Sequence, residues 1–346
     1  MPLFDSSRFP WPQRGDINLW ADFAERICLF SDGGQLSLED FKDWLVDDRT
    51  KTSEEIESSL NFNYDFLRTV PVAVARQVVN EVEEDDTENE NLDAINSKLI
   101  TLFNFISKRQ NVYGLHYPFR VQNNIISLQS QPTNIQKAYI ILLMSSDLRI
   151  YDAANINRLG HHFEALCEGP FSRLVSNNAT VKFFGSGAGT IMRTDYAGNL
   201  QTRIRALAND IGLDTTNAIE DPDELSPTGD AGLDWVAWAA FPDQLNHQPL
   251  FFGQCACGSN WVDKQHETSL ARWRNYFDIN QPVHHIHFLP RSFRRINKEW
   301  LQKTAIEDVI LIDRPRLLFL IEQNDITPIL TRYNDLLEET ERFLLE

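Results

Sequence analysis

Basic residues are scarce in this chain. It has 32 Lys and Arg against 50 Asp and Glu, which gives a formal net charge of −18 at pH 7. Neutralisation of phosphate charges supplies most of the non-specific affinity of proteins for DNA, so this balance argues against a protein that coats DNA on its own. Any role on nucleic acid must therefore depend on a local basic patch, a bound metal ion or a partner.

Long apolar runs are missing and cysteines are few. No apolar stretch approaches the roughly 20 residues needed to span a bilayer. The first residues also lack the basic, apolar and cleavage-site order of a signal peptide, so we expect no membrane association and a cytoplasmic location. Four cysteines at irregular positions in 346 residues make a poor disulfide framework, because a chain of this length can bury a full core without cross-links. We expect reduced thiols.

The spacing of apolar residues divides the chain into three expected regions. Segments 17–30, 38–45 and 92–106 have apolar residues three and four positions apart, which predicts a helical N-terminal domain over residues 1–150. Ser37 followed by Asp40 has the form of a helix N-terminal cap. We expect an α/β core over residues 151–298 and a helical C-terminal segment over residues 299–346.

The expected core alternates helical and strand-like segments. Helical spacing is found at 159–167 and 200–211. Residues favourable to strands are found at 180–184, 233–241, 249–255 and 283–289, with 308–312 as a further candidate. The order predicts a sheet flanked by helices.

Three oxygen-bearing side chains occupy informative places in this order. Glu164 lies in the first helix, Asp234 begins a strand after the turn Gly229-Asp230-Ala231-Gly232-Leu233, and Gln254 lies near the end of the next strand. Adjacent strands would bring Asp234 and Gln254 together. Phosphodiester hydrolysis commonly uses a divalent cation, and hard cations prefer such oxygen ligands.

The pattern resembles the PD-(D/E)xK nuclease superfamily, above all its Mrr-like branch, in which a Gly-Asp-x-Gly-x-Asp turn precedes one strand and Gln-x-Lys ends the next. The resemblance covers residues 159–257. It implies a restriction-endonuclease-like mixed sheet flanked by helices, and Mg²⁺ (or Mn²⁺) held by Asp234, Gln254, Glu164 and the main-chain carbonyl of Cys255. It further implies cleavage of DNA in restriction or antiviral defence, with a protein partner or a second copy of the chain assisting.

One family position is replaced. The pattern requires lysine where this chain has Ala256, and that lysine would orient the attacking water and stabilise charge. Lys264 is the first candidate to replace it, because residues 258–263 form a connection short enough to fold back over the site, and Lys182 on the first strand is the second. The alternative is a catalytically inactive nuclease-fold subunit that binds nucleic acid or a partner protein.

Two further clusters have competing interpretations. Arg291, Arg294 and Arg295 are interleaved with aromatic residues and are either a nucleic-acid-binding surface or a solvated helix face. Cys255 and Cys257, with the histidines near 161 and 284, could form a zinc site, yet no second cysteine pair completes it. His284 lies on a predicted strand and could instead face the nuclease site.

Overall fold

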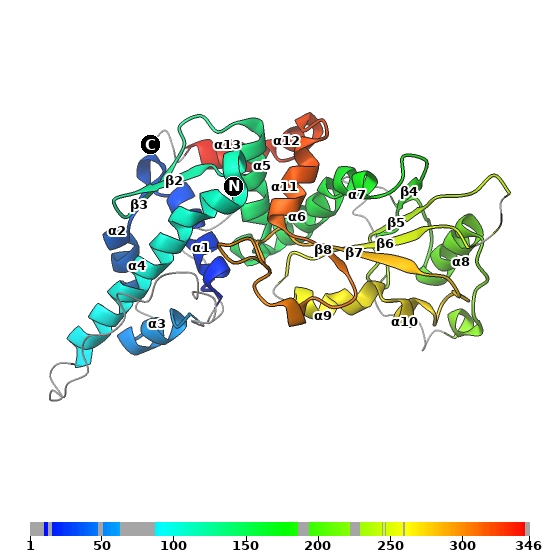
Figure 1. The fold of residues 1–346 in the computed structure, drawn as a ribbon, viewed down its shortest axis with the longest axis horizontal. Coiled ribbons are helices and arrows are strands. Elements are labelled where there is room, and N and C mark those ends of the chain that lie inside the picture. The colour runs from blue at the N-terminus through cyan, green and yellow to red at the C-terminus, as the bar shows by residue number, and fades with distance from the viewer. Residues whose placement is uncertain are drawn as a thin grey trace. The chain divides into compact units, whose positions relative to one another are not determined.

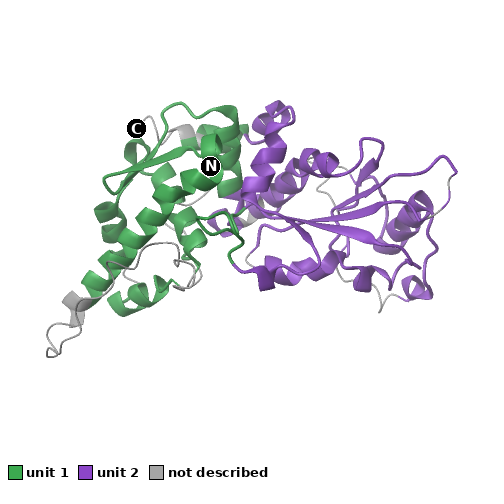
Figure 2. Cartoon of the chain, viewed as in Figure 1, with its two compact units in different colours: residues 1–143, 291–301, 334–346 green, residues 144–290, 302–333 purple. Residues whose placement is uncertain are grey.

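Two compact units make up the protein, whose computed structural model describes residues 10–12, 16–47, 51–62, 87–185, 194–221, 229–243, 245, 247–258 and 260–342. Unit 1 comprises residues 1–143, 291–301 and 334–346, and unit 2 comprises residues 144–290 and 302–333 (Figure 2). Both contain helices and a sheet, so the predicted α/β class is confirmed (Figure 1). The three expected segments do not map onto the units one to one. Among the described residues, no helix is long and apolar enough to cross a membrane.

Unit 1 combines helices with a small antiparallel sheet. Its elements are α1 (Ile17–Leu29), β1 (Gln35–Ser37), α2 (Leu38–Val46), α3 (Ser53–Ser59), α4 (Thr87–Tyr113), β2 (Phe119–Gln122), β3 (Ile125–Leu128), most of α5 (Asn134–Ser145) and α13 (Asn334–Arg342). The predicted helices at 17–30, 38–45 and 92–106 are confirmed. The predicted cap is also found, because the Ser37 hydroxyl accepts a hydrogen bond from the Asp40 N–H at 3.0 Å and the Asp40 carboxylate accepts one from the Ser37 N–H.

The sheet of unit 1 was not predicted. Its strand order is β1-β3-β2, and β2 and β3 form a hairpin whose two central residues, Asn123 and Asn124, are both left-handed (φ 50° and 59°). Asparagine tolerates this conformation better than most residues. The expected helical domain is therefore a mixed one.

A buried ionic cluster links the helices of unit 1. Arg109 of α4 lies 2.8 Å from the Asp22 carboxylate and 2.7 Å from that of Glu25, both on α1, and all three side chains are almost completely buried. Tyr117 and Tyr139 donate hydrogen bonds to the two oxygens of Glu25, at 2.6 and 2.7 Å. The carboxylates are thus paired and hydrogen-bonded, as buried charges must be.

Unit 2 contains a five-stranded mixed sheet. Its strands, in spatial order, are β4 (Thr180–Phe183), β5 (Trp235–Trp238), β6 (Leu250–Cys255), β7 (Val283–Phe288) and β8 (Ile310–Ile312). The pairs β4–β5 and β5–β6 are antiparallel, and β6–β7 and β7–β8 are parallel. All five predicted strand segments are therefore strands of one sheet. The helices of the unit are α6 (Ala153–Leu166), α7 (Glu168–Leu174), α8 (Leu200–Ile211), α9 (Trp261–Lys264), α10 (Leu270–Trp273), α11 (Arg314–Glu322) and α12 (Thr327–Arg332).

Helices cover both faces of this sheet. On one face, Phe252 packs with Trp273 of α10 at 5.2 Å between ring centroids, in a core that also includes the apolar residues of α8. On the other face, Phe171 of α7 contacts the rings of Trp235 and Phe288. A Cβ atom at Gly253 would lie 3.1 Å from the Phe171 ring, so glycine lets α7 pack closely over β6.

Candidate active site

Asp234 is fixed at the start of β5. Its side chain is buried, and its Oδ2 atom accepts a hydrogen bond from the Cys255 N–H at 2.6 Å. Its own N–H donates to the Gly253 carbonyl at 3.0 Å, and its carbonyl accepts from the Phe184 N–H at 2.7 Å. The residue is therefore held from both neighbouring strands, and its carboxylate lies at the end of β6.

The turn before Asp234 is tight because a neighbouring segment packs on it. Ala231 and Gly232 are left-handed (φ 51° and 78°), and Asp230 accepts a hydrogen bond from the Gly232 N–H at 2.9 Å. A Cβ atom at Gly232 would lie 2.5 Å from Oε2 and 2.6 Å from Cβ of Glu267. Glycine at this position permits the close approach of a neighbouring protein side chain.

Glu164 reaches the start of β5 from α6. The Glu164 carbonyl accepts a hydrogen bond from the Trp235 indole N–H at 3.0 Å, which ties α6 to the residue after Asp234. The partly exposed Glu164 carboxylate lies 3.0 Å from Nδ1 of His161, one helical turn earlier. This hydrogen bond raises the pKa of His161, and the negative charge of Asp230 adds to the effect.

The charges of several elements act on the Asp234 carboxyl. Burial raises its pKa well above the ordinary value, and the negative charges of Glu164 and Asp230 raise it further. The Cys255 N–H and the positive charge of Lys264 oppose this rise. Lys264 ends the four-residue helix α9, and its side chain is half-buried. The charges of Glu164 and Lys264 therefore both act on Asp234, although the three residues lie on separate elements.

Gln254 lies beside this group on β6. It is buried, and its Oε1 atom has no hydrogen-bond partner within the described parts of the chain. Its neighbour Cys255 donates to Asp234 through the main chain, while the Cys255 thiol forms a hydrogen bond with that of Cys167. Burial raises the pKa of both thiols. The expected role of the Cys255 carbonyl stays a prediction.

His287 and Asp230 were not predicted as residues of the nuclease site. His287 is in register with Gln254 on the parallel strand β7, and burial lowers its pKa to about 3, with the Lys264 charge contributing. Its place could not be found from the sequence, because the pairing of β6 with β7 joins residues distant in the chain. Asp230 could have been found, since it belongs to the Gly-Asp turn that identifies Asp234.

Lys182, the second candidate to replace the missing lysine, is engaged elsewhere. Its ammonium group lies 2.6 Å from the Asp210 carboxylate of α8. It also makes cation–π contacts with the rings of Tyr196 and Trp238, at 5.2 and 5.6 Å from their centroids. Of the two lysines, Lys264 is the one whose charge acts on Asp234.

The predicted basic cluster belongs to unit 1 and is not helical. Arg291 is buried, the Arg294 guanidinium stacks on Trp300 at 4.9 Å, and Arg295 Nε donates to the Leu301 carbonyl. The alternative of a solvated helix face is therefore wrong, because the segment pairs Arg294 with Trp300 in a short bridge. A role of these arginines in nucleic-acid binding stays a prediction.

Oxygen donors at the site suit a hard cation. The expected set contains two carboxylates (Asp234 and Glu164), a main-chain carbonyl (Cys255) and the Gln254 amide oxygen, which is buried and lacks a partner in the described residues. Such groups are typical ligands of Mg²⁺ and Mn²⁺. Among the described residues, no group of three or more His, Cys, Asp or Glu side chains is arranged to hold a metal ion.

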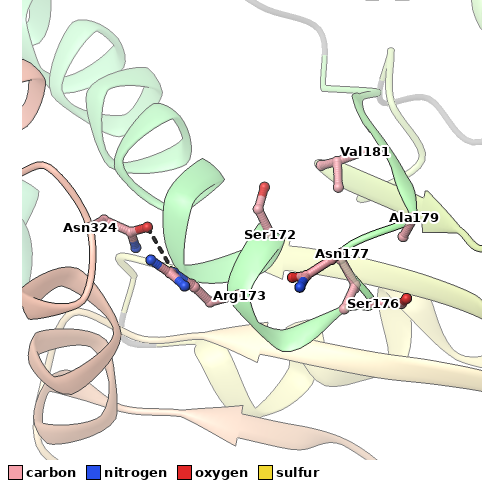
Figure 3. Close-up of a pocket in the computed structure, with 8 residues that line it drawn as sticks. Ser172, Arg173, Ser176, Asn177, Ala179, Val181 and Asn324 are labelled. Atoms are coloured by element: carbon pink, nitrogen blue, oxygen red, sulfur yellow. Dashed lines mark hydrogen bonds between the residues drawn. The ribbon is translucent and has the colours of Figure 1, made fainter.

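A separate hollow lies between the end of α7, the following loop and β4 (Figure 3). Its volume is about 290 Å³, and Arg173 at its rim donates a hydrogen bond to the Asn324 side chain at 3.0 Å. The residues that line it are Ser172, Arg173, Val175, Ser176, Asn177, Ala179, Val181 and Asn324. None of the predicted site residues is among them, so this hollow is distinct from the carboxylate group at Asp234.

Comparison of the chain with protein-family models, with curated proteins and with solved structures found no match in any of the three.

Proposed function

We propose that unit 2 is a metal-dependent DNA endonuclease in which Lys264 replaces the lysine absent at position 256. The observation that supports this most strongly is geometric: the Asp234 carboxylate accepts a hydrogen bond from the Cys255 N–H at the end of β6, and the Glu164 carbonyl on α6 accepts one from the side chain of Trp235, the next residue after Asp234. The charges of Glu164 and Lys264 both act on the Asp234 carboxyl. Two carboxylates can hold a divalent cation for phosphodiester hydrolysis, and a lysine can stabilise the negative charge that develops on the phosphoryl group.

Each residue has a defined task in this proposal. Asp234, Glu164, Gln254 and the Cys255 carbonyl would hold Mg²⁺ or Mn²⁺, which when bound polarises the phosphoryl oxygen and lowers the pKa of a water molecule. Lys264 supplies a positive charge to the developing negative charge of the phosphoryl group. His161 holds the Glu164 carboxylate in place through the 3.0 Å contact.

The burial of Asp234 favours a cation at this position. A carboxylate that is buried beside the negative charges of Glu164 and Asp230 is destabilised in its ionised form. A nearby dication would offset this repulsion, and the single lysine does so only in part. A bound ion would therefore offset part of the cost of ionising Asp234.

The cellular role and the partners are proposed from the family resemblance alone. They are restriction or antiviral defence, with DNA as substrate and with a protein partner or a second copy of the chain. A partner would help because the net charge of −18 repels phosphate. The second candidate function, an inactive nuclease-fold subunit, is favoured by one observation, the alanine at position 256.

Cleavage of supercoiled plasmid with Mg²⁺ or Mn²⁺ tests the proposal. We expect nicking by the parent protein, none in EDTA, and none by Asp234→Asn, a change that keeps the size of the side chain and its ability to accept from Cys255. The exposed Asp243→Asn is the matched control and should cleave like the parent. Metal-independent binding without cleavage would support the inactive-subunit alternative and contradict the proposal.

A further inference from the structure

Three buried polar atoms at the candidate site lack hydrogen-bond partners in the part of the chain that the structure describes. Oε1 of Gln254 and both ring nitrogens of His287 have none among the residues that the structure describes. Gln254 is 3% exposed and His287 is 0% exposed. A buried polar group without a hydrogen bond costs roughly 1–3 kcal/mol, so both groups are expected to find a partner.

The sheet places these side chains next to each other. Gln254 on β6 is in register with His287 on the parallel strand β7. Side chains alternate between the faces of a strand, so Gln254 shares a face with Phe252, and His287 shares one with His285. The rings of Phe252 and His285 are 6.4 Å apart, which shows that the two faces are the same. Trp261 of α9 packs against His287 at 6.1 Å, which helps to keep water from the ring.

The chemistry of the two groups is complementary. A fully buried imidazole beside Lys264 is neutral, so it has one N–H group and one nitrogen with a free lone pair. A carboxamide has a donor end and an acceptor end of similar shape, and a half-turn about its last bond exchanges them. If the NH₂ group of Gln254 faces His287, its oxygen is left free for a cation. If the oxygen faces His287, the NH₂ group faces the site and repels a cation.

We infer that His287 is a positioning residue that accepts a hydrogen bond from Nε2 of Gln254 and so turns Oε1 of Gln254 toward the carboxylates. The inference rests on the proposed function for the part that concerns the cation. The hydrogen bond itself does not, since it also gives one ring nitrogen of the buried His287 a partner when no ion is bound. Partners that orient a metal ligand typically change metal affinity about 10- to 100-fold when they are removed.

Nitrogen NMR of the full-length protein with ¹⁵N-labelled histidine tests the hydrogen bond directly. We expect one ring nitrogen of His287 to show the shift of a hydrogen-bond acceptor, and Gln254→Leu should abolish that shift. His284→Leu is the matched control, because His284 lies on the same strand but is exposed and stacks on Phe251 on the opposite face. His287→Gln identifies the signal.

Mn²⁺ binding, measured by titration calorimetry on the same variants, tests the consequence. We expect His287→Leu to weaken Mn²⁺ binding at least about 10-fold. His287→Gln, which keeps an acceptor, should restore most of the affinity, and His284→Leu should bind like the parent. In a Gln254→Leu background, His287→Leu should have no further effect.

The outcomes separate this inference from the proposed function. A His287 signal that is unchanged by Gln254→Leu, or equal Mn²⁺ affinity of His287→Leu and the parent, overturns the inference. A parent protein that binds no Mn²⁺ while its His287 signal responds to Gln254→Leu supports the hydrogen bond and contradicts the proposed metal site.

Discussion

Replacing Gly232 by alanine tests the close packing between the turn before Asp234 and the segment that follows Lys264. Gly232 has a left-handed backbone (φ 78°), and a Cβ atom there would lie 2.6 Å from Cβ of Glu267. A left-handed conformation costs an L-residue about 1–2 kcal/mol. Glu267 Cβ is close to its own main chain and must move with it, which adds roughly 1–3 kcal/mol, as in other overpacked sites. The expected loss in the free energy of unfolding is therefore about 2–5 kcal/mol.

Gly212 offers the matched control for this prediction. It is also left-handed (φ 68°), at the end of α8, and a Cβ atom there would have no neighbour within 4 Å. Gly212→Ala should therefore cost only the backbone part, about 1–2 kcal/mol. A domain of this size loses about 2–4 °C in Tm per kcal/mol. Calorimetry should show a fall of roughly 4–20 °C for Gly232→Ala and roughly 2–8 °C for Gly212→Ala.

Plasmid cleavage well below the Tm completes the test. Glu267 follows α9 closely in the chain, so its displacement should also move Lys264 and reduce cleavage by Gly232→Ala while Gly212→Ala cleaves normally. Equal stability losses in the two variants would refute the close packing of Glu267 on the turn. Normal cleavage by Gly232→Ala would refute the coupling to Lys264.

Three further predictions concern charge. Asp234→Asn should raise the Tm of the protein in EDTA, and this gain should grow from pH 5 to pH 8. The reason is that the pKa of Asp234 is raised in the folded protein, so the parent protein loses stability as the pH rises and this carboxyl ionises, whereas asparagine does not ionise. Arg109→Leu should destabilise unit 1 by about 3–5 kcal/mol, because it leaves two buried carboxylates unpaired, whereas Arg149→Ala breaks an exposed pair and should cost at most about 1 kcal/mol. Arg294→Gln and Arg295→Gln should each reduce the salt dependence of DNA binding by about one unit of slope, if these half-exposed arginines contact phosphate.

Each of these has a contradicting result. An unchanged or lower Tm of Asp234→Asn at pH 8 would show that the buried carboxylate is not destabilised. A denaturant midpoint of Arg109→Leu equal to that of the parent would contradict the paired cluster. If the salt dependence of DNA binding has the same slope in Arg294→Gln and Arg295→Gln as in the parent, these two arginines make no phosphate contact.

Most of the sheet in unit 2 was predictable, because its strands are strongly apolar and have β-branched or aromatic residues. The same holds for α1, α2 and α8, whose apolar faces and caps are local signals. The hairpin at Asn123 and Asn124 was missed, since it uses two asparagines in place of the usual glycine. The division into units could not be predicted either, because residues 291–301 pack in unit 1 through contacts distant in sequence, such as that of Asn18 with the Arg294 carbonyl.

The sequence predicted only those parts of the candidate site that follow from the order of the strands along the chain. Asp234 directly precedes β5 and Gln254 lies near the end of the antiparallel neighbour β6, so the two residues are close once these consecutive strands pair. The position of Lys264 depends on how the chain returns after β6, and the pairing of Gln254 with His287 depends on a parallel crossover. The short connection after β6 was enough to name Lys264 as a candidate, whereas the parallel crossover leaves no local signal in the sequence.

The most direct test of the central claim is single-turnover plasmid cleavage by Lys264→Ala, with Lys182→Ala as the control lysine. Loss of a charge that stabilises the transition state typically costs about 10²–10³ in rate, so Lys264→Ala should lose cleavage by that factor while its Tm stays close to that of the parent. Lys182→Ala should cleave at the parent rate, because that lysine is paired with Asp210. Cleavage by Lys264→Ala at the parent rate would contradict the claim, as would an inactive parent that gains cleavage through Ala256→Lys.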